Sequence, residues 1–168
     1  MTKILYVVHP DSILEQSVDI RHVKPFLDKL SNAIKSFSGI VIVTKIPSYS
    51  YNKTAEGFAY AEKFMASIKG NPKVIVVDEK RAKGALGTEA MSKYIDDLFL
   101  KGELDKITLA GCFTCTYSTM CLDETYSALV REYGSDKVEI DQSLTMKAGP
   151  VTLPRDAALR VCLSYLKK

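Results

Sequence analysis

The segment KVIVVDEKRAKGALGTEAMSKYIDDLFLKGELDKITLAG, residues 73–111, decides the fold of this chain. It begins with the β-branched run Lys73–Val77 and closes with the apolar run Lys106–Gly111, and neither run has a polar face to turn toward water. Between them lies a helical pattern that Thr88 caps and Gly102 ends. A buried strand, a helix and a second buried strand in this order predict a parallel pair joined by a right-handed crossover.

The same alternation continues on both sides of this segment. Further strands are predicted at Lys3–Val8, Gly39–Thr44 and Lys137–Ile140, and further helices at Pro25–Phe37, Thr54–Gly70, Ser118–Tyr133 and from Pro154 to the C-terminus. Such strands need helices on both sides. The pattern therefore predicts a single α/β domain over residues 1–168, with a three-layer, doubly wound fold and a mainly parallel sheet of five to six strands.

Composition and charge narrow the class of protein. The chain has 168 residues, of which 46% are hydrophobic, and a formal net charge of +3. Its densest basic patch, Glu79–Lys83, is short, whereas a nucleic-acid partner normally requires basic residues gathered on one face. The sequence begins without a signal-peptide pattern and contains no apolar stretch of membrane-spanning length. We therefore expect a cytoplasmic protein with neither a nucleic-acid nor a membrane partner.

Residues that follow the strands are the candidate site residues, because parallel α/β sheets bind ligands beyond the carboxyl ends of their strands. These residues are His9, Pro10, Asp11, Lys45, Asp78, Lys80, the cysteines after the fourth strand, and Asp141. A cysteine requires a lysine, a histidine or a helix N-terminus nearby to become a thiolate at neutral pH. Cys121 has all three within reach, since Ser118 is a plausible N-cap three residues before it.

Two segments resemble the isochorismatase-like cysteine hydrolases, a superfamily that includes nicotinamidases and N-carbamoylsarcosine amidohydrolase. EKRAKGALGTEAM, residues 79–91, is similar to the family's lysine followed by a small-small-hydrophobic triplet and Gly-Thr. STMCLDETYSALVREYG, residues 118–134, is similar to the family's Thr-x-x-Cys-hydrophobic-x-x-Thr helix start. The resemblance implies that Lys80 is the catalytic lysine, Cys121 the nucleophile and Thr125 the matching threonine.

The chain also departs from this family. Family members usually carry an aspartate at the end of the first strand, where this chain has His9, with Asp11 two residues later. The family's cysteine usually follows the strand-ending glycine more closely than Cys121 follows Gly111, so Cys115 is an alternative nucleophile. The Asp-x-His metal site of nicotinamidases is absent. Either Asp11 or His9 is therefore the candidate proton-transfer group, and we expect neither a metal nor another cofactor.

These residues favour a cysteine-dependent hydrolase that cleaves an amide-like C–N bond of a small molecule through a thioester intermediate on Cys121. Lys80 would stabilise the thiolate and the substrate. Asp11 or His9 would transfer a proton to the leaving amine and then activate water. The resemblance also implies a homodimer or a larger homo-oligomer.

Two other classes of function stay open. A non-catalytic α/β binding or assembly domain would retain this framework after losing its acid. A thiol redox or metal-binding protein would use Cys112 and Cys115, although a closed zinc site needs four N or S ligands and the local sequence adds only Cys121. Buried core packing is the simpler role for Cys112, because cysteine is among the most buried residue types.

Overall fold

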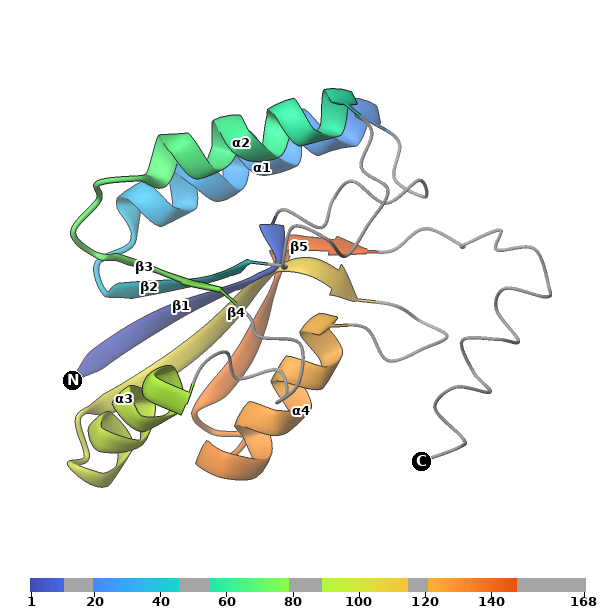
Figure 1. Ribbon diagram of the computed structural model, residues 1–168. Helices are drawn as coiled ribbons and strands as arrows, with labels where there is room; N and C mark the ends of the chain where they lie inside the picture. Colours follow the sequence, from blue (N-terminus) through green and yellow to red (C-terminus); the bar gives the residue numbers. More distant parts are fainter. Residues whose placement is uncertain (11–19, 46–54, 79–88, 115–120, 148–168) are drawn as a thin grey trace, which may run out of the picture.

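The computed structural model describes residues 1–10, 20–45, 55–78, 89–114 and 121–147. Strands and helices alternate through these ranges (Figure 1). The strands are β1 (Thr2–Val8), β2 (Ile40–Lys45), β3 (Val74–Asp78), β4 (Leu104–Thr114) and β5 (Val138–Lys147), and the helices are α1 (Ile20–Ser36), α2 (Ala55–Ile68), α3 (Glu89–Leu100) and α4 (Cys121–Tyr133). The predicted α/β fold is confirmed. The helix expected from Pro154 onward lies outside the described residues.

The five strands form one parallel sheet in the order β3-β2-β1-β4-β5. The central strand β1 pairs with β2 on one side and with β4 on the other. From β1 the chain moves outward to β2 and β3, and it then crosses back through α3 to start the other half of the sheet at β4. The direction of winding therefore reverses between β1 and β4.

Helices cover both faces of the sheet: α1 and α2 lie side by side on one face, and α3 and α4 lie on the other (Figure 1). Successive residues of β1 alternate between the two cores, because strand side chains point to opposite faces. Leu5 and Val7 pack toward α1 and α2, whereas Ile4 and Tyr6 pack toward α3 and α4. Covering both faces explains the uniformly apolar strands. None of the helices in the described ranges is long and apolar enough to cross a membrane.

The ends of the helices follow the sequence signals with one exception. Gly70, Gly102 and Gly134 follow α2, α3 and α4 with positive φ angles of 84°, 67° and 90°, the conformation that commonly ends a helix. The exception is α1, which begins at Ile20, so Pro25 lies inside the helix and the prediction of a first-turn proline is wrong. Proline has no backbone N–H, so the helix loses one hydrogen bond at this position.

Strands β4 and β5 are longer than the sequence predicts. β4 continues past Gly111 to Thr114, because β5 resumes pairing with it at Thr145 after a bulge. Asp141 lies in this bulge, where its Oδ1 accepts a hydrogen bond from the Ser143 N–H (2.8 Å) and its carbonyl accepts one from the Thr145 hydroxyl (2.5 Å). The expectation that Asp141 follows the fifth strand as a site residue is therefore wrong.

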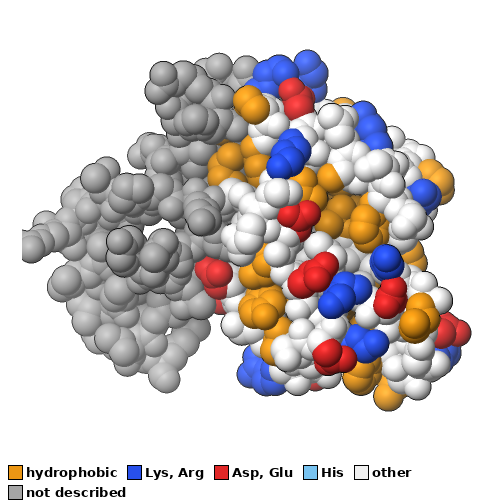
Figure 2. All heavy atoms as spheres, turned by 180° about the vertical axis from the view of Figure 1, so that it is seen from behind, with side chains coloured by type: hydrophobic (Ala, Val, Ile, Leu, Met, Phe, Trp, Pro, Cys, Tyr) orange, Lys and Arg blue, Asp and Glu red, His pale blue; other side chains and the backbone are white. Residues whose placement is uncertain are grey.

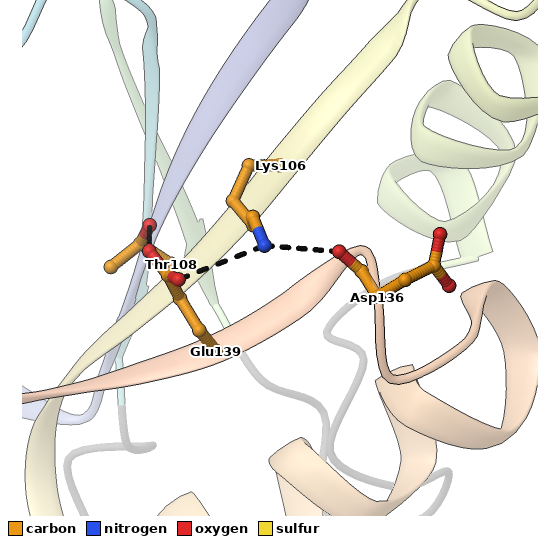
Figure 3. Close-up of polar contacts among 4 residues, drawn as sticks. All are labelled: Lys106, Thr108, Asp136 and Glu139. Atoms are coloured by element: carbon orange, nitrogen blue, oxygen red, sulfur yellow. Dashed lines mark hydrogen bonds and ion pairs between the residues drawn. The ribbon is translucent and has the colours of Figure 1, made fainter.

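A polar cluster joins the first halves of β4 and β5 (Figure 3). The Lys106 ammonium donates a hydrogen bond to the carbonyl oxygen of Asp136 (3.0 Å) and lies 3.7 Å from Glu139 Oε2. The Thr108 hydroxyl donates to Glu139 Oε1 at 3.0 Å. Because the Lys106 and Glu139 side chains are 36% and 54% exposed, their ion pair is screened by water and stabilises the fold only slightly.

Candidate active site at the carboxyl edge of the sheet

The carboxyl edge between β1 and β4 is the place where this topology predicts a ligand. Winding reverses there, and the helices that come next in the chain after β1 and β4, α1 and α4, lie on opposite faces of the sheet. Val8, the last residue of β1, pairs with Gly111 of β4, so the backbone that follows β1 lies beside the end of β4. The last residues of β2 and β3, Lys45 and Asp78, are paired neighbours at the same edge.

His9 follows β1 directly at this edge, as the sequence predicts. It is 6% exposed and adopts a φ of 42°, the left-handed region that side-chain-bearing residues rarely occupy. Its N–H donates to the Thr44 hydroxyl (3.3 Å), and that hydroxyl donates to the Val7 carbonyl (3.4 Å). The buried Thr44 side chain thus links β2 to the backbone at the end of β1. Unusual backbone of this kind concentrates at functional sites, so His9 is a candidate site residue on structural grounds as well.

Gly111 permits the close approach of β4 to β1. Its φ is 106°, and a Cβ at this position would lie 2.2 Å from the carbonyl oxygen of Val8. No side chain fits there without movement of the backbone. Gly111 is inside β4 and does not end it, so the segment between strand and helix runs from residue 115 to residue 120.

Cys121 is the first residue of α4, in agreement with its predicted place in the first turn of a helix. Its side chain is partly buried and packs against the core beneath α3 and α4. The neighbouring Leu122 is fully buried and fixes the start of the helix to the sheet. Thr125, which is 1% exposed, donates its hydroxyl hydrogen bond to the Cys121 carbonyl at 2.7 Å. Two buried neighbours therefore hold Cys121 at the helix N-terminus.

The charges around the start of α4 have opposing effects on an anion. The helix N-terminus carries a partial positive charge that favours a thiolate or an oxyanion. Asp123 and Glu124 lie in the same first turn, where they stabilise the helix and at the same time repel an anion at Cys121. An activated thiolate at this position would therefore need positive charge from outside α4.

Three of the predicted site residues, Asp11, Lys80 and Cys115, lie outside the described residues. Lys80 belongs to the segment that follows β3, whose last residue Asp78 is at the carboxyl edge. The assembly of Asp11 or His9 with Lys80 and Cys121 in one site therefore stays a prediction.

The two described cysteines pack on opposite faces of the sheet. Cys112 is fully buried in the core beneath α1 and α2, as predicted for a core residue, whereas Cys121 packs against the core beneath α3 and α4. Their side chains therefore do not meet, which argues against a metal site that combines the two. Within the described ranges, no group of three or more His, Cys, Asp and Glu side chains gathers around a common point.

Sequence reasoning missed the contributions of Thr44 and Gly111 to this edge. Thr44 reads as the last residue of a strand, and Gly111 reads as a glycine that ends one. A polar residue at the buried end of an otherwise apolar strand was the available signal for Thr44. Nothing local indicated the role of Gly111, because its constraint comes from Val8, a residue remote in sequence.

The overall fold is similar to that of a known amidase. No family model matches the sequence, and no curated protein matches it. Among solved structures, the crystal structure of N-carbamoylsarcosine amidase from Thermoplasma acidophilum matches with a TM-score of 0.57 and 13% sequence identity, over 96% of this chain and 92% of that chain. At this low identity the similarity shows the fold alone. The chain therefore shares its α/β fold with this amidase.

Proposed function

We propose that this protein hydrolyses an amide-like C–N bond of a small molecule, with Cys121 as the nucleophile. The observation that supports the proposal is the position of Cys121 at the N-terminus of α4, the helix that follows β4 in the chain, where the sheet reverses its winding. The resemblance of residues 79–91 and 118–134 to isochorismatase-like cysteine hydrolases supports the same residue. Similarity of the whole fold to N-carbamoylsarcosine amidase supports the same class of bond.

The reaction would proceed in two steps, formation of a thioester and its hydrolysis. In the first, the Cys121 thiolate attacks the carbonyl carbon, the C–N bond breaks, and Asp11 or His9 delivers a proton to the departing amine. In the second, the same group removes a proton from water, which attacks the thioester carbonyl and releases the acid and the thiolate. Backbone N–H groups at the start of α4 would stabilise the oxyanion, and Lys80 would hold the thiolate and the substrate.

The first experiment measures alkylation of each cysteine against pH, mapped by peptide mass spectrometry, in wild type and Lys80→Ala. We expect Cys121 to react rapidly well below pH 8.5, about the pKa of an ordinary thiol, and to slow at low pH when Lys80 is removed. Cys112 is the internal control, because its complete burial restricts alkylation to unfolded molecules. Slow alkylation of Cys121 in native wild-type protein would overturn its role as nucleophile.

The second experiment tests hydrolysis with a panel of small amides and carbamoyl compounds. Cys121→Ala should lower any activity found by at least about a thousandfold, the order expected on removal of a covalent nucleophile. His9→Asn and Asp11→Asn distinguish the two candidate proton-transfer groups. The variant that still becomes alkylated at Cys121 but loses hydrolysis identifies that group.

A second candidate function, a non-catalytic binding or assembly domain, is favoured by the residue at the end of β1. His9 stands where the family usually has aspartate, and it is buried rather than open to a ligand. An inert Cys121 together with unchanged alkylation in Lys80→Ala would favour this alternative. Reversible formation of a Cys112–Cys115 disulfide in native protein would instead support thiol redox chemistry.

A further inference from the structure

A separate hollow lies in the groove between α1 and α2 and shares no residue with the candidate active site. Its volume is about 340 Å³, which falls in the range of small-ligand sites. Leu27 and Phe64, each 4% exposed, line its apolar part. The hydroxyl groups of Ser31 and Ser67 approach to 3.0 Å between the two helices and add a polar part. The hollow therefore combines a buried apolar floor with two hydroxyl groups that can form hydrogen bonds to a polar ligand.

Positive charge dominates the rim of this hollow. Three lysines and one aspartate line it, so the charged side chains sum to +2. Lys24 forms an ion pair with Asp28, four residues later in α1. Within the described residues, neither Lys35 nor Lys63 has an ion pair with a carboxylate. Basic side chains also lie along the upper edge of the molecule in Figure 2, the side on which α1 and α2 lie in Figure 1.

The lysines of the rim come from both helices. Lys24 and Lys35 occupy one stripe of α1, and a rise of about 1.5 Å per residue separates them by roughly 16 Å along the helix axis. Lys63 faces them from α2, in the turn that contains Phe64. A chain of phosphate groups presents several anionic groups and can contact lysines of both helices at once, and lysine is a common point-charge partner of phosphate.

We propose that the groove between α1 and α2 binds the phosphate chain of an oligophosphate, with Lys35 and Lys63 as its main contacts. The small volume favours such a ligand over an acidic peptide, which would need a longer groove. The charge of +2 on the rim offsets a polyanion, and the Asn32 amide at the same rim can donate hydrogen bonds to phosphate oxygens.

Calorimetric titration of the full-length protein with tripolyphosphate at low salt tests this proposal. We expect a dissociation constant on the order of 0.1 to 1 mM and binding at least about tenfold weaker for inorganic phosphate. Lys35→Glu with Lys63→Glu should weaken tripolyphosphate at least about tenfold. Adenosine triphosphate is titrated in parallel, and tighter binding of it would identify a nucleotide as the source of the phosphate chain.

The matched control is Lys93→Glu with Lys101→Glu, which reverses two exposed lysines of α3 and the turn after it. Each double variant lowers the formal net charge by four, from +3 to −1, so general electrostatic attraction changes equally. The control should bind tripolyphosphate within about twofold of wild type. If Lys35→Glu with Lys63→Glu does not fold, Lys35→Gln with Lys63→Gln replaces it, with the same expected direction.

Three results would overturn the proposal: no saturable binding of tripolyphosphate by wild type, equal weakening in both double variants, or equally tight binding of inorganic phosphate. Tighter binding of hexa-aspartate than of tripolyphosphate would likewise exclude an oligophosphate as the ligand class.

Discussion

The two ends of the parallel sheet are held together by different means. At the amino end, side chains connect neighbouring elements: the Tyr133 hydroxyl donates to Asp96 (2.8 Å) and joins α4 to α3, and Lys106 donates to the Asp136 carbonyl. At the carboxyl end the backbone itself is constrained. His9 directly after β1 and Gly111 inside β4 have φ angles of 42° and 106°.

The two ends of the sheet differ in where left-handed backbone occurs, and not in close packing alone. Gly39, at the amino end before β2, also lies against backbone, since a Cβ there would be 2.1 Å from the Lys3 carbonyl oxygen, but its φ is not in the left-handed region. At the amino end, positive φ occurs in the glycines of turns that follow helices, where it is common. At the carboxyl end it occurs in and beside paired strands. Constrained backbone thus coincides with the edge where this class of sheet binds ligands.

The largest effect is expected at Gly111. Gly111→Ala should lower the free energy of unfolding by about 4 kcal/mol or more, because the new Cβ meets the Val8 carbonyl and the residue is held at positive φ. Urea unfolding midpoints measure the loss. Gly102→Ala has a similar backbone but open space around the Cβ, and it should cost only about 1 kcal/mol. Equal losses in the two variants would contradict the special role of Gly111.

A smaller effect is expected at His9. His9→Val should lower the free energy of unfolding by about 2 kcal/mol more than His9→Asn, because asparagine tolerates left-handed backbone and a β-branched residue does not. Both variants lose the buried imidazole, so that loss cancels in their difference. Thermal denaturation followed by circular dichroism measures it. If the two variants are equally stable, the backbone at this edge is not a constraint.

The amino end should respond more weakly. Tyr133→Phe removes the hydrogen bond to the exposed Asp96 and should cost about 1 kcal/mol. Burial, and then the bond to Asp96, raises the pKa of Tyr133 well above its usual range. The folded protein thus holds the Tyr133 proton more tightly than the unfolded chain does. The contribution of the protonated hydroxyl to stability is therefore fully present below about pH 10 and falls as the pH rises above 10.

The dependence of unfolding free energy on alkaline pH distinguishes the effect of the Tyr133–Asp96 hydrogen bond from general effects of high pH. The difference in unfolding free energy between wild type and Tyr133→Phe should shrink as the pH is raised from about 9 to 11. Tyr126→Phe is the control for removal of a tyrosine hydroxyl from the same helix. A difference that stays constant over this range would show that the Tyr133–Asp96 bond does not titrate with folding.

The smallest effect is expected for the cluster in Figure 3. Lys106→Ala should change the free energy of unfolding by no more than about 0.5 kcal/mol, because its ion pair with Glu139 is long and partly exposed. A double-mutant cycle with Glu139→Ala measures the coupling between the two side chains. A coupling above about 1 kcal/mol would mean that this ion pair holds β4 and β5 together, which contradicts a weak pair screened by water.

The sequence predicted most of the fold, because the signals involved are local. Apolar runs marked the five strands, and glycines such as Gly102 and Gly134 marked the ends of helices. Its errors lie where a distant partner decides the outcome. β4 and β5 extend past their apolar runs because each provides backbone hydrogen bonds for the other, and Asp141 is drawn into the resulting bulge.

For the candidate site, the sequence identified Cys121 at a helix start and His9 after the first strand, since helix signals and strand ends can be read locally. Tertiary structure alone decided that His9 is buried with left-handed backbone, that Thr44 bridges it to β2, and that Cys112 and Cys121 lie on opposite faces of the sheet. The physical reason is that burial, backbone strain and the side of a sheet depend on contacts between segments that are distant in sequence. The sequence determines which reactive side chains the protein has, and packing between strands and helices determines which of them can act together.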